Sequence, residues 1–146
     1  MTFRKAVLTL AVLLLATAPL ALAQGTYTQI DYPGAVQTEC WGIDNAGDVV
    51  GEYVDGLGIS HGFLLSGGAY STIDYPHLRD TGLYGINDVG QIVGFAQVQG
   101  FLYDTQTQLF TPVNRPGASY SVLTGINDEG TIVGYSAGAS GNYFRL

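Results

Sequence analysis

Short apolar runs alternate with turn residues along the chain from about residue 27 onward. β-Branched and aromatic residues fill these runs, and Gly, Asn, Asp and Pro separate them at short, regular intervals. This pattern predicts many short β-strands joined by tight turns. Because no stretch of this region has the period of an amphipathic helix, we expect an all-β domain.

One ten-residue motif occurs three times. The copies are GIDNAGDVVG at 42–51, GINDVGQIVG at 85–94 and GINDEGTIVG at 125–134. Two flanking blocks recur as well, as YTQIDYPGA at 27–35 and YSTIDYPHL at 70–78, and as HGFLLSGG at 61–68 and QGFLYDTQ at 99–106. Together these blocks predict three repeats with periods of 43 and 40 residues.

The second repeat is expected to hold four strands, at about 62–66, 70–74, 83–87 and 91–97. Asn and Asp side chains cap tight turns, and Gly accepts a positive φ angle. The segments NDVG and NDEG therefore predict hairpin loops of three to five residues between the last two strands. The repeated Val-Gly pair predicts an inward apolar side chain, followed by a position that another backbone or an aromatic ring approaches closely.

Four strands in a period of about 40 residues are typical of a β-propeller blade, although closed propellers have four to eight blades. Two architectures therefore stay open: an arc of three antiparallel, propeller-like repeats of four strands each, or a closed threefold barrel of the β-trefoil kind. The first repeat begins at its second strand, TYTQIDYP (26–33), and the missing strand occurs as YFRL (143–146). We expect these terminal strands to pair, within one chain or between copies of a homo-oligomer.

The first 23 residues are predicted to be a secretory signal peptide, which leaves 24–146 as a single β-repeat domain. Arg4 and Lys5 precede an apolar stretch that ends in the small residues Ala21-Leu22-Ala23. An uncleaved anchor is the competing interpretation, but the segment is short for one and has a cleavage signature. We therefore expect a secreted protein, extracellular or periplasmic.

Removal of this segment leaves three arginines and no lysine against twelve carboxylates, a formal charge of −9. Such a charge repels phosphate backbones and anionic membrane surfaces. We expect neither nucleic acid nor a membrane as a partner.

The blocks HGFLLSGG, STIDYP and YGINDVGQIVGFA, in that order, resemble the HAF family of extracellular repeats from secreted bacterial proteins. The tripeptide that names the family corresponds to His61-Gly62-Phe63 here, with Gly in place of Ala. The likeness covers most of residues 26–146. It implies a secreted, β-rich, propeller-like repeat protein, and it brings no catalytic residues with it.

Candidate chemistry is sparse. The segment GYSAG around Ser136 matches a nucleophile elbow, but no histidine follows it to act as a base. Asp44, Asp88 and Asp128 lie in the repeated loops, where turn formation is the favoured role and acid–base work on a polymer is the alternative. The segment DNAGD at 44–48 offers oxygen ligands without a complete calcium loop, so calcium is the only cofactor that stays open. We predict no catalytic residue and no metal site.

The single cysteine, Cys40, stands where the later repeats have Leu83 and Leu123. Two leucines at equivalent positions predict a buried apolar site. We therefore expect Cys40 to be a core residue rather than a reactive thiol or a partner in an intermolecular disulfide.

Five residues are candidates for ligand binding: Trp41, Tyr84, His77, Arg79 and Asp80. Trp41 and Tyr84 occupy the same repeat position, and exposed aromatic rings can stack on sugars, although packing in the core is the competing role. The other three lie in PHLRDTG, the least regular connection. We expect a secreted, non-enzymatic module that binds carbohydrate or another protein; the alternative is an extracellular hydrolase or lyase acting on polysaccharide.

Overall fold

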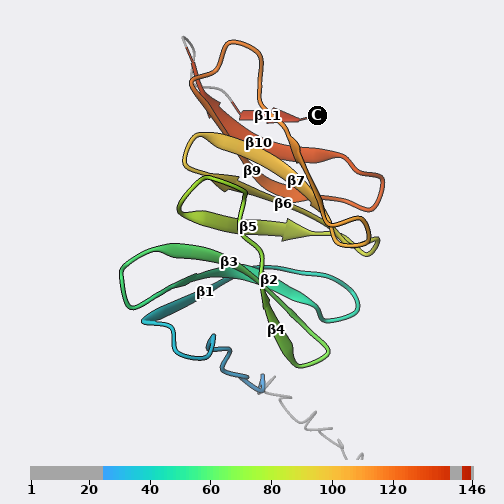
Figure 1. Ribbon diagram of the computed structural model, residues 1–146. Helices are drawn as coiled ribbons and strands as arrows, with labels where there is room; N and C mark the ends of the chain where they lie inside the picture. The colour runs from blue at the N-terminus through green and yellow to red at the C-terminus, as the bar shows by residue number, and fades with distance from the viewer. Residues whose placement is uncertain (1–24, 139–142, 146) are drawn as a thin grey trace, which may run out of the picture.

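The computed structural model describes residues 25–138 and 143–145, and every regular element in them is a β-strand (Figure 1). The first sheet contains β1 (Gln37–Ile43), β2 (Val49–Val54), β3 (Ser60–Ser66) and β4 (Ala69–Thr72). The second contains β5 (Thr81–Ile86), β6 (Gln91–Ala96), β7 (Gln99–Asp104) and β8 (Leu109–Pro112). The third contains β9 (Tyr120–Ile126), β10 (Ile132–Ala137) and β11 (Tyr143–Arg145).

All neighbouring strands are antiparallel, so the prediction of an all-β, antiparallel fold is confirmed. The described part of the chain has no helix of the length and apolar character needed to cross a membrane. The predicted signal peptide lies outside the described residues.

The sheets divide the repeats differently from the sequence prediction. The strands expected at 62–66 and 70–74 are β3 and β4 of the first sheet, whereas those expected at 83–87 and 91–97 are β5 and β6 of the second. The strand expected in TYTQIDYP is absent, because residues 26–33 pair with no strand in the described chain. The third sheet has three described strands rather than four.

The three sheets are separate and lie one after another along the molecule (Figure 1). β5 packs against β1, β2 and β3, and β9 packs against β5, β6 and β7. The first strand of each later sheet thus lies against the face of the sheet before it. The described strands form an open stack and do not close into a barrel, so the β-trefoil alternative does not describe this chain.

Two apolar layers hold the stack together. Between the first and second sheets, Val50 meets Leu83 and Ile92, and all three side chains are fully buried. Between the second and third sheets, Val93 meets Leu123 and Ile132, which occupy the same repeat positions. Each fully buried aliphatic side chain of this kind contributes about 1.5–3 kcal/mol to stability.

The first glycine of the repeated motif lies where neighbouring sheets approach each other. A Cβ atom on Gly42 would lie 3.2 Å from the Cα atom of Gly85, and one on Gly85 would lie 3.0 Å from the Cα atom of Gly125. The three inner strands β1, β5 and β9 therefore meet backbone to backbone at this position.

The glycine of the Val-Gly pair is crowded from two sides. A Cβ atom on Gly94 would overlap the carbonyl oxygen of Gly82 on β5, and it would lie 2.8 Å from the ring of Phe101 on β7. Gly51 has the corresponding neighbours, Glu39 and Phe63. Close approach by both a backbone and an aromatic ring confirms the prediction for the glycine. The predicted inward apolar side chain is confirmed for Val50 and Val93 and wrong for Val133, which is 45% exposed because no described sheet follows it.

The NDVG segment forms the predicted hairpin loop between β5 and β6. The side-chain Oδ1 of Asn87 accepts a hydrogen bond from the Gln91 amide at 2.8 Å, and the Gly90 amide donates to the Asn87 carbonyl at 3.0 Å. Gly90 has a φ angle of +79°. The corresponding loops that begin at Asp44 and Asn127 contain the same hydrogen bonds.

The prediction that Cys40 is a core residue is wrong, because its side chain is exposed. Its counterparts Leu83 and Leu123 are fully buried, since each faces the preceding sheet. The first sheet has no preceding sheet among the described residues. The same repeat position is therefore buried in two sheets and open to solvent in the first.

We predict that Gly94→Ala will destabilise the protein by at least about 2 kcal/mol, because the added methyl group overlaps a backbone oxygen that cannot move without disrupting the sheet. Denaturant unfolding followed by circular dichroism measures the change. Gly56→Ala is the matched control, since a Cβ atom there meets no atom within 4 Å. Equal stability of the two variants would contradict the packing described here.

Candidate functional site

A bulge at the same position of each sheet frees one side chain of the first strand. The register between the first and second strands shifts by one residue in every sheet, and the residues left without a partner are Trp41, Tyr84 and Thr124. A β-bulge of this kind redirects a side chain relative to its neighbours. Because β1, β5 and β9 lie side by side, the three redirected side chains fall along one face of the stack.

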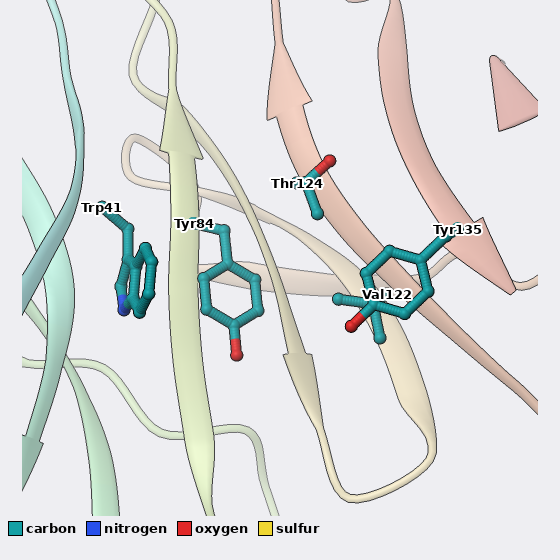
Figure 2. A pocket seen from close by; sticks show the side chains of 5 residues that line it. All are labelled: Trp41, Tyr84, Val122, Thr124 and Tyr135. Carbon is teal, nitrogen blue, oxygen red and sulfur yellow. The ribbon is translucent and has the colours of Figure 1, made fainter. Parts of the chain in front are cut away.

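This face carries an open cleft of about 370 Å³, lined by the three bulge residues together with Val122 of β9 and Tyr135 of β10 (Figure 2). The rings of Trp41 and Tyr84 meet edge to face, with centroids 5.7 Å apart and planes at 84°. Trp41 remains 53% exposed and Tyr135 40% exposed. Two aromatic surfaces are thus available to solvent at opposite sides of the cleft.

The aromatic surface continues beyond the cleft across the second and third sheets. Tyr120 of β9 packs edge-on against Tyr135 and against Phe95 of β6, with ring centroids 6.4 Å apart in both pairs. Tyr120 is itself 36% exposed. A ligand longer than the cleft would therefore meet further rings.

Carboxylates lie on the side of the cleft formed by the first sheet. Glu39 and Glu52 are directly opposite each other on β1 and β2. A Cβ atom on Gly82 would lie 2.6 Å from a carboxylate oxygen of Glu52 and 2.9 Å from the Tyr84 hydroxyl oxygen. The missing side chain of Gly82 thus leaves the space in which the Glu52 carboxylate and the Tyr84 hydroxyl lie together.

The surroundings of Glu52 and Tyr84 raise the pKa of both side chains. Burial raises the pKa of the Glu52 carboxyl, and the charges of Glu39 and Asp80 raise it further. Burial, followed by the negative charge of Glu52, raises the pKa of Tyr84 to about 12. The Tyr84 hydroxyl therefore keeps its proton at neutral pH and can donate a hydrogen bond.

The residues around the cleft differ between repeats, in contrast to the repeated Gly, Ile and Val residues of the scaffold. The three sets of equivalent positions are Glu39, Gly82 and Val122; Trp41, Tyr84 and Thr124; and Glu52, Phe95 and Tyr135. The positions that differ between the repeats thus lie on one face of the stack, around the cleft.

The structure brings together some of the ligand-binding residues predicted from the sequence. Trp41 and Tyr84 both line the cleft. Asp80 lies near Glu52, at the acidic side. His77 and Arg79 are exposed in the connection between β4 and β5, and they are not among the lining residues of the cleft.

Sequence reasoning missed Tyr135, Val122, Thr124 and Glu52. The only available signal was that these positions vary among the repeats, and this signal becomes useful only once the inner strands are known to lie side by side.

The carboxylates of the repeated loops either cap their own loop or link it to the neighbouring loop. The carboxylate of Asp88 accepts hydrogen bonds from the amide and the side chain of Asn45, at 2.9 and 2.6 Å, and the Asp88 amide donates to Asp128 at 2.9 Å. Asp44 caps its own loop. Among the described residues, no three His, Cys, Asp or Glu side chains are placed to hold a metal ion. These contacts assign Asp44 the predicted turn-forming role, whereas Asp88 and Asp128 bridge neighbouring loops and their own loops are capped by Asn87 and Asn127.

The surroundings of His61 and Ser136 are those of residues with a structural role. His61 lies between two carboxylates, with Nδ1 2.8 Å from Asp74 and Nε2 3.4 Å from Asp55. His77 lies in the next connection and does not share this site. Ser136 is buried within β10, whereas a nucleophile elbow needs a sharp turn after a strand.

We predict that Glu52→Gln will raise the melting temperature at neutral pH but not below about pH 4. The folded-state pKa of Glu52 is raised above its ordinary value of 4.5, so the folded protein binds this proton more tightly than the unfolded chain does. Stability is therefore lost as the pH rises from the unfolded pKa through the folded pKa, and the neutral amide avoids this loss. Thermal unfolding across the pH range measures the effect.

Glu129→Gln is the control, because Glu129 is exposed in the β9–β10 loop. A gain in melting temperature that is equal for both variants, or independent of pH, would contradict the assignment of the effect to Glu52.

Comparison with known proteins adds no identification: no family model matches the chain, and no curated protein matches it.

Proposed function

We propose that the protein is a secreted carbohydrate-binding module and that the cleft between Trp41 and Tyr135 is its binding site. The observation that carries the proposal is the pair of solvent-exposed rings at the two sides of one cleft, with hydroxyl and carboxylate groups between and beside them. Binding sites commonly combine apolar and aromatic walls with a few polar groups that fix the orientation of the ligand.

The faces of sugar rings carry C–H groups that pack on aromatic rings, while their edges carry hydroxyl groups. Trp41 and Tyr135 supply the aromatic surfaces. The Tyr84 hydroxyl, which is protonated at neutral pH, supplies a donor, and the Glu52 carboxylate beside it supplies an acceptor. Thr124 adds a hydroxyl on the cleft wall. Both kinds of sugar surface thus have partners here.

The charge of the site narrows the class of sugar. Glu39 and Glu52 lie opposite each other on the first sheet, with Asp80 close to Glu52. These carboxylates repel uronic acids and sulfated sugars, and they attract ammonium groups, which also interact favourably with aromatic rings. We therefore infer a neutral glycan or one that contains amino sugars.

Export is part of the same proposal. It rests on the sequence of residues 1–23, and polymeric glycans outside the cell are the ligands that an exported module would meet.

The sequence contains a single tryptophan, and it lies in the cleft, so its fluorescence can report binding directly. We predict that neutral or amino-sugar oligosaccharides will change this fluorescence in a saturable way, whereas uronate oligosaccharides will not. Tyr135→Ala should weaken the apparent affinity at least tenfold, because it removes the ring opposite Trp41. The measurement is a fluorescence titration with isothermal calorimetry as a second readout.

Leu57→Ala is the control, since Leu57 is 86% exposed in the β2–β3 connection, outside the set of residues that line the cleft. The proposal fails if a panel of neutral and amino-sugar oligosaccharides gives neither a fluorescence change nor heat with folded protein. It also fails if Tyr135→Ala and Leu57→Ala bind equally well.

A further inference from the structure

The two outer sheets expose apolar residues at positions that are covered in the middle sheet. We call the side of a sheet that points toward the sheet before it in the chain its preceding face, and the opposite side its following face. The two internal layers each join a following face to a preceding face. The middle sheet uses both of its faces. Within the described chain, the first sheet leaves Cys40 and Ile43 of its preceding face exposed, whereas Val49 and Phe63 on that face are buried and Tyr32 packs on Phe63. The third sheet leaves Val133 of its following face exposed.

The preceding faces of the first and second sheets differ in exposure at the same repeat position. Ile86 of the second sheet is packed in the apolar layer against the first sheet and is only 8% exposed. Its counterpart in the first sheet, Ile43, is 67% exposed. Cys40 is exposed on the same face, and together with Ile30 and Val49 these residues line a shallow apolar opening of about 290 Å³.

The following face shows the same contrast. Val50 and Val93 are fully buried because the next sheet covers them. Their counterpart on the third sheet, Val133, is 45% exposed beside Gly125 and Ile126. Apolar side chains at positions that are buried in the two internal layers are thus exposed at each end of the stack.

We propose that the following face of the third sheet docks on the preceding face of the first sheet of a second copy, in the way that each sheet docks on the next within the chain. The two internal layers supply the template for this contact, since the same repeat positions already pack together twice in this molecule. The contact joins different surfaces, so it is heterologous, and two copies related head to tail can close into a ring.

The segment before β1 fits the same arrangement. The counterparts of residues 27–29 are Tyr70 to Thr72 of β4, which pair with β3 as the outermost strand of the first sheet. Residues 27–29 themselves are exposed and have no strand partner in the described chain. In the head-to-tail dimer they would add to the outer edge of β11 in the second copy, in the register that places Gln29 opposite Phe144.

Two such copies would contain six stacked sheets, which falls in the range of closed β-propellers. Closure would cover Ile43 and Val133 in both copies. Tyr135 lies on the same face of β10 as Val133, so the second copy would border the cleft that Tyr135 lines. Closure would also pair the outer edge of β11 in each copy, which otherwise invites uncontrolled pairing.

The test uses the exported protein, purified with reducing agent so that Cys40 cannot form a disulfide. Light scattering should give twice the mass of one chain. Ile43→Asp and Val133→Asp should each give monomers, because each places a charge in the contact. In an equimolar mixture each mixed pair has one intact contact and one that carries both aspartates. The mixture should therefore form dimers more weakly than the parent but more strongly than either variant alone.

Leu57→Asp, in an exposed connection away from both faces, should remain a dimer and serves as the control. Circular dichroism establishes that each variant is folded. If Ile43→Asp does not fold, the mass of Val133→Asp and the alkylation rate of Cys40 still test whether the protein dimerises through these faces.

Cys40 provides a second readout that a folding defect does not reproduce. Val133 lies on the third sheet and Cys40 on the first, so within one chain a change at Val133 does not uncover the thiol. In the dimer the second copy covers Cys40, and alkylation should be at least tenfold slower in the parent than in Val133→Asp. A monomeric parent, or equal alkylation rates in the parent and in Val133→Asp, would overturn the proposal.

Discussion

The structure depends on the close approach of backbones where one sheet meets the next. Gly42 and Gly85 bring the three inner strands so close together that a Cβ atom on either would lie 3.0–3.3 Å from the neighbouring backbone. A second row of glycines allows the bulged first strand and an aromatic ring to press on the second strand of each sheet. The aliphatic layers can interlock only because these positions are empty. The main role of the repeated motif is therefore to set the distance between neighbouring sheets.

The bulge that crowds the second row of glycines also creates the candidate site. Because the first strand carries one extra residue opposite its partner, that residue is free of the ladder and of the apolar layers. Its identity can change without cost to the scaffold, and it reads Trp, Tyr and Thr in the three repeats. One structural device thus separates positions that hold the stack from positions that can recognise a ligand.

Local features of the fold were readable from the sequence because they depend on local chemistry. The Asn-Asp-x-Gly loops follow from turn preferences, and the crowding at Gly94 follows from a glycine placed within a strand pattern. The grouping into sheets was not readable, because a periodic sequence does not reveal which strand begins a unit. Cys40 was misplaced for a related reason: alignment with Leu83 assumes a neighbouring sheet that the first repeat lacks. Trp41 and Tyr84 were found through their shared position, whereas Glu52 and Tyr135 required the packing of three sheets.

Within the described residues, only the middle sheet is packed against another sheet on both faces, and this makes the three repeats unequal in the freedom of their sequences to change. Where repeats contact only their neighbours, stability is approximately a sum over neighbouring interfaces. A substitution that weakens the packing of the middle sheet disturbs two such interfaces, and the same substitution in an outer sheet of a single chain disturbs one. The middle repeat is therefore the copy whose sequence is most tightly constrained, and the outer repeats are where new surface chemistry can arise at the least cost to folding.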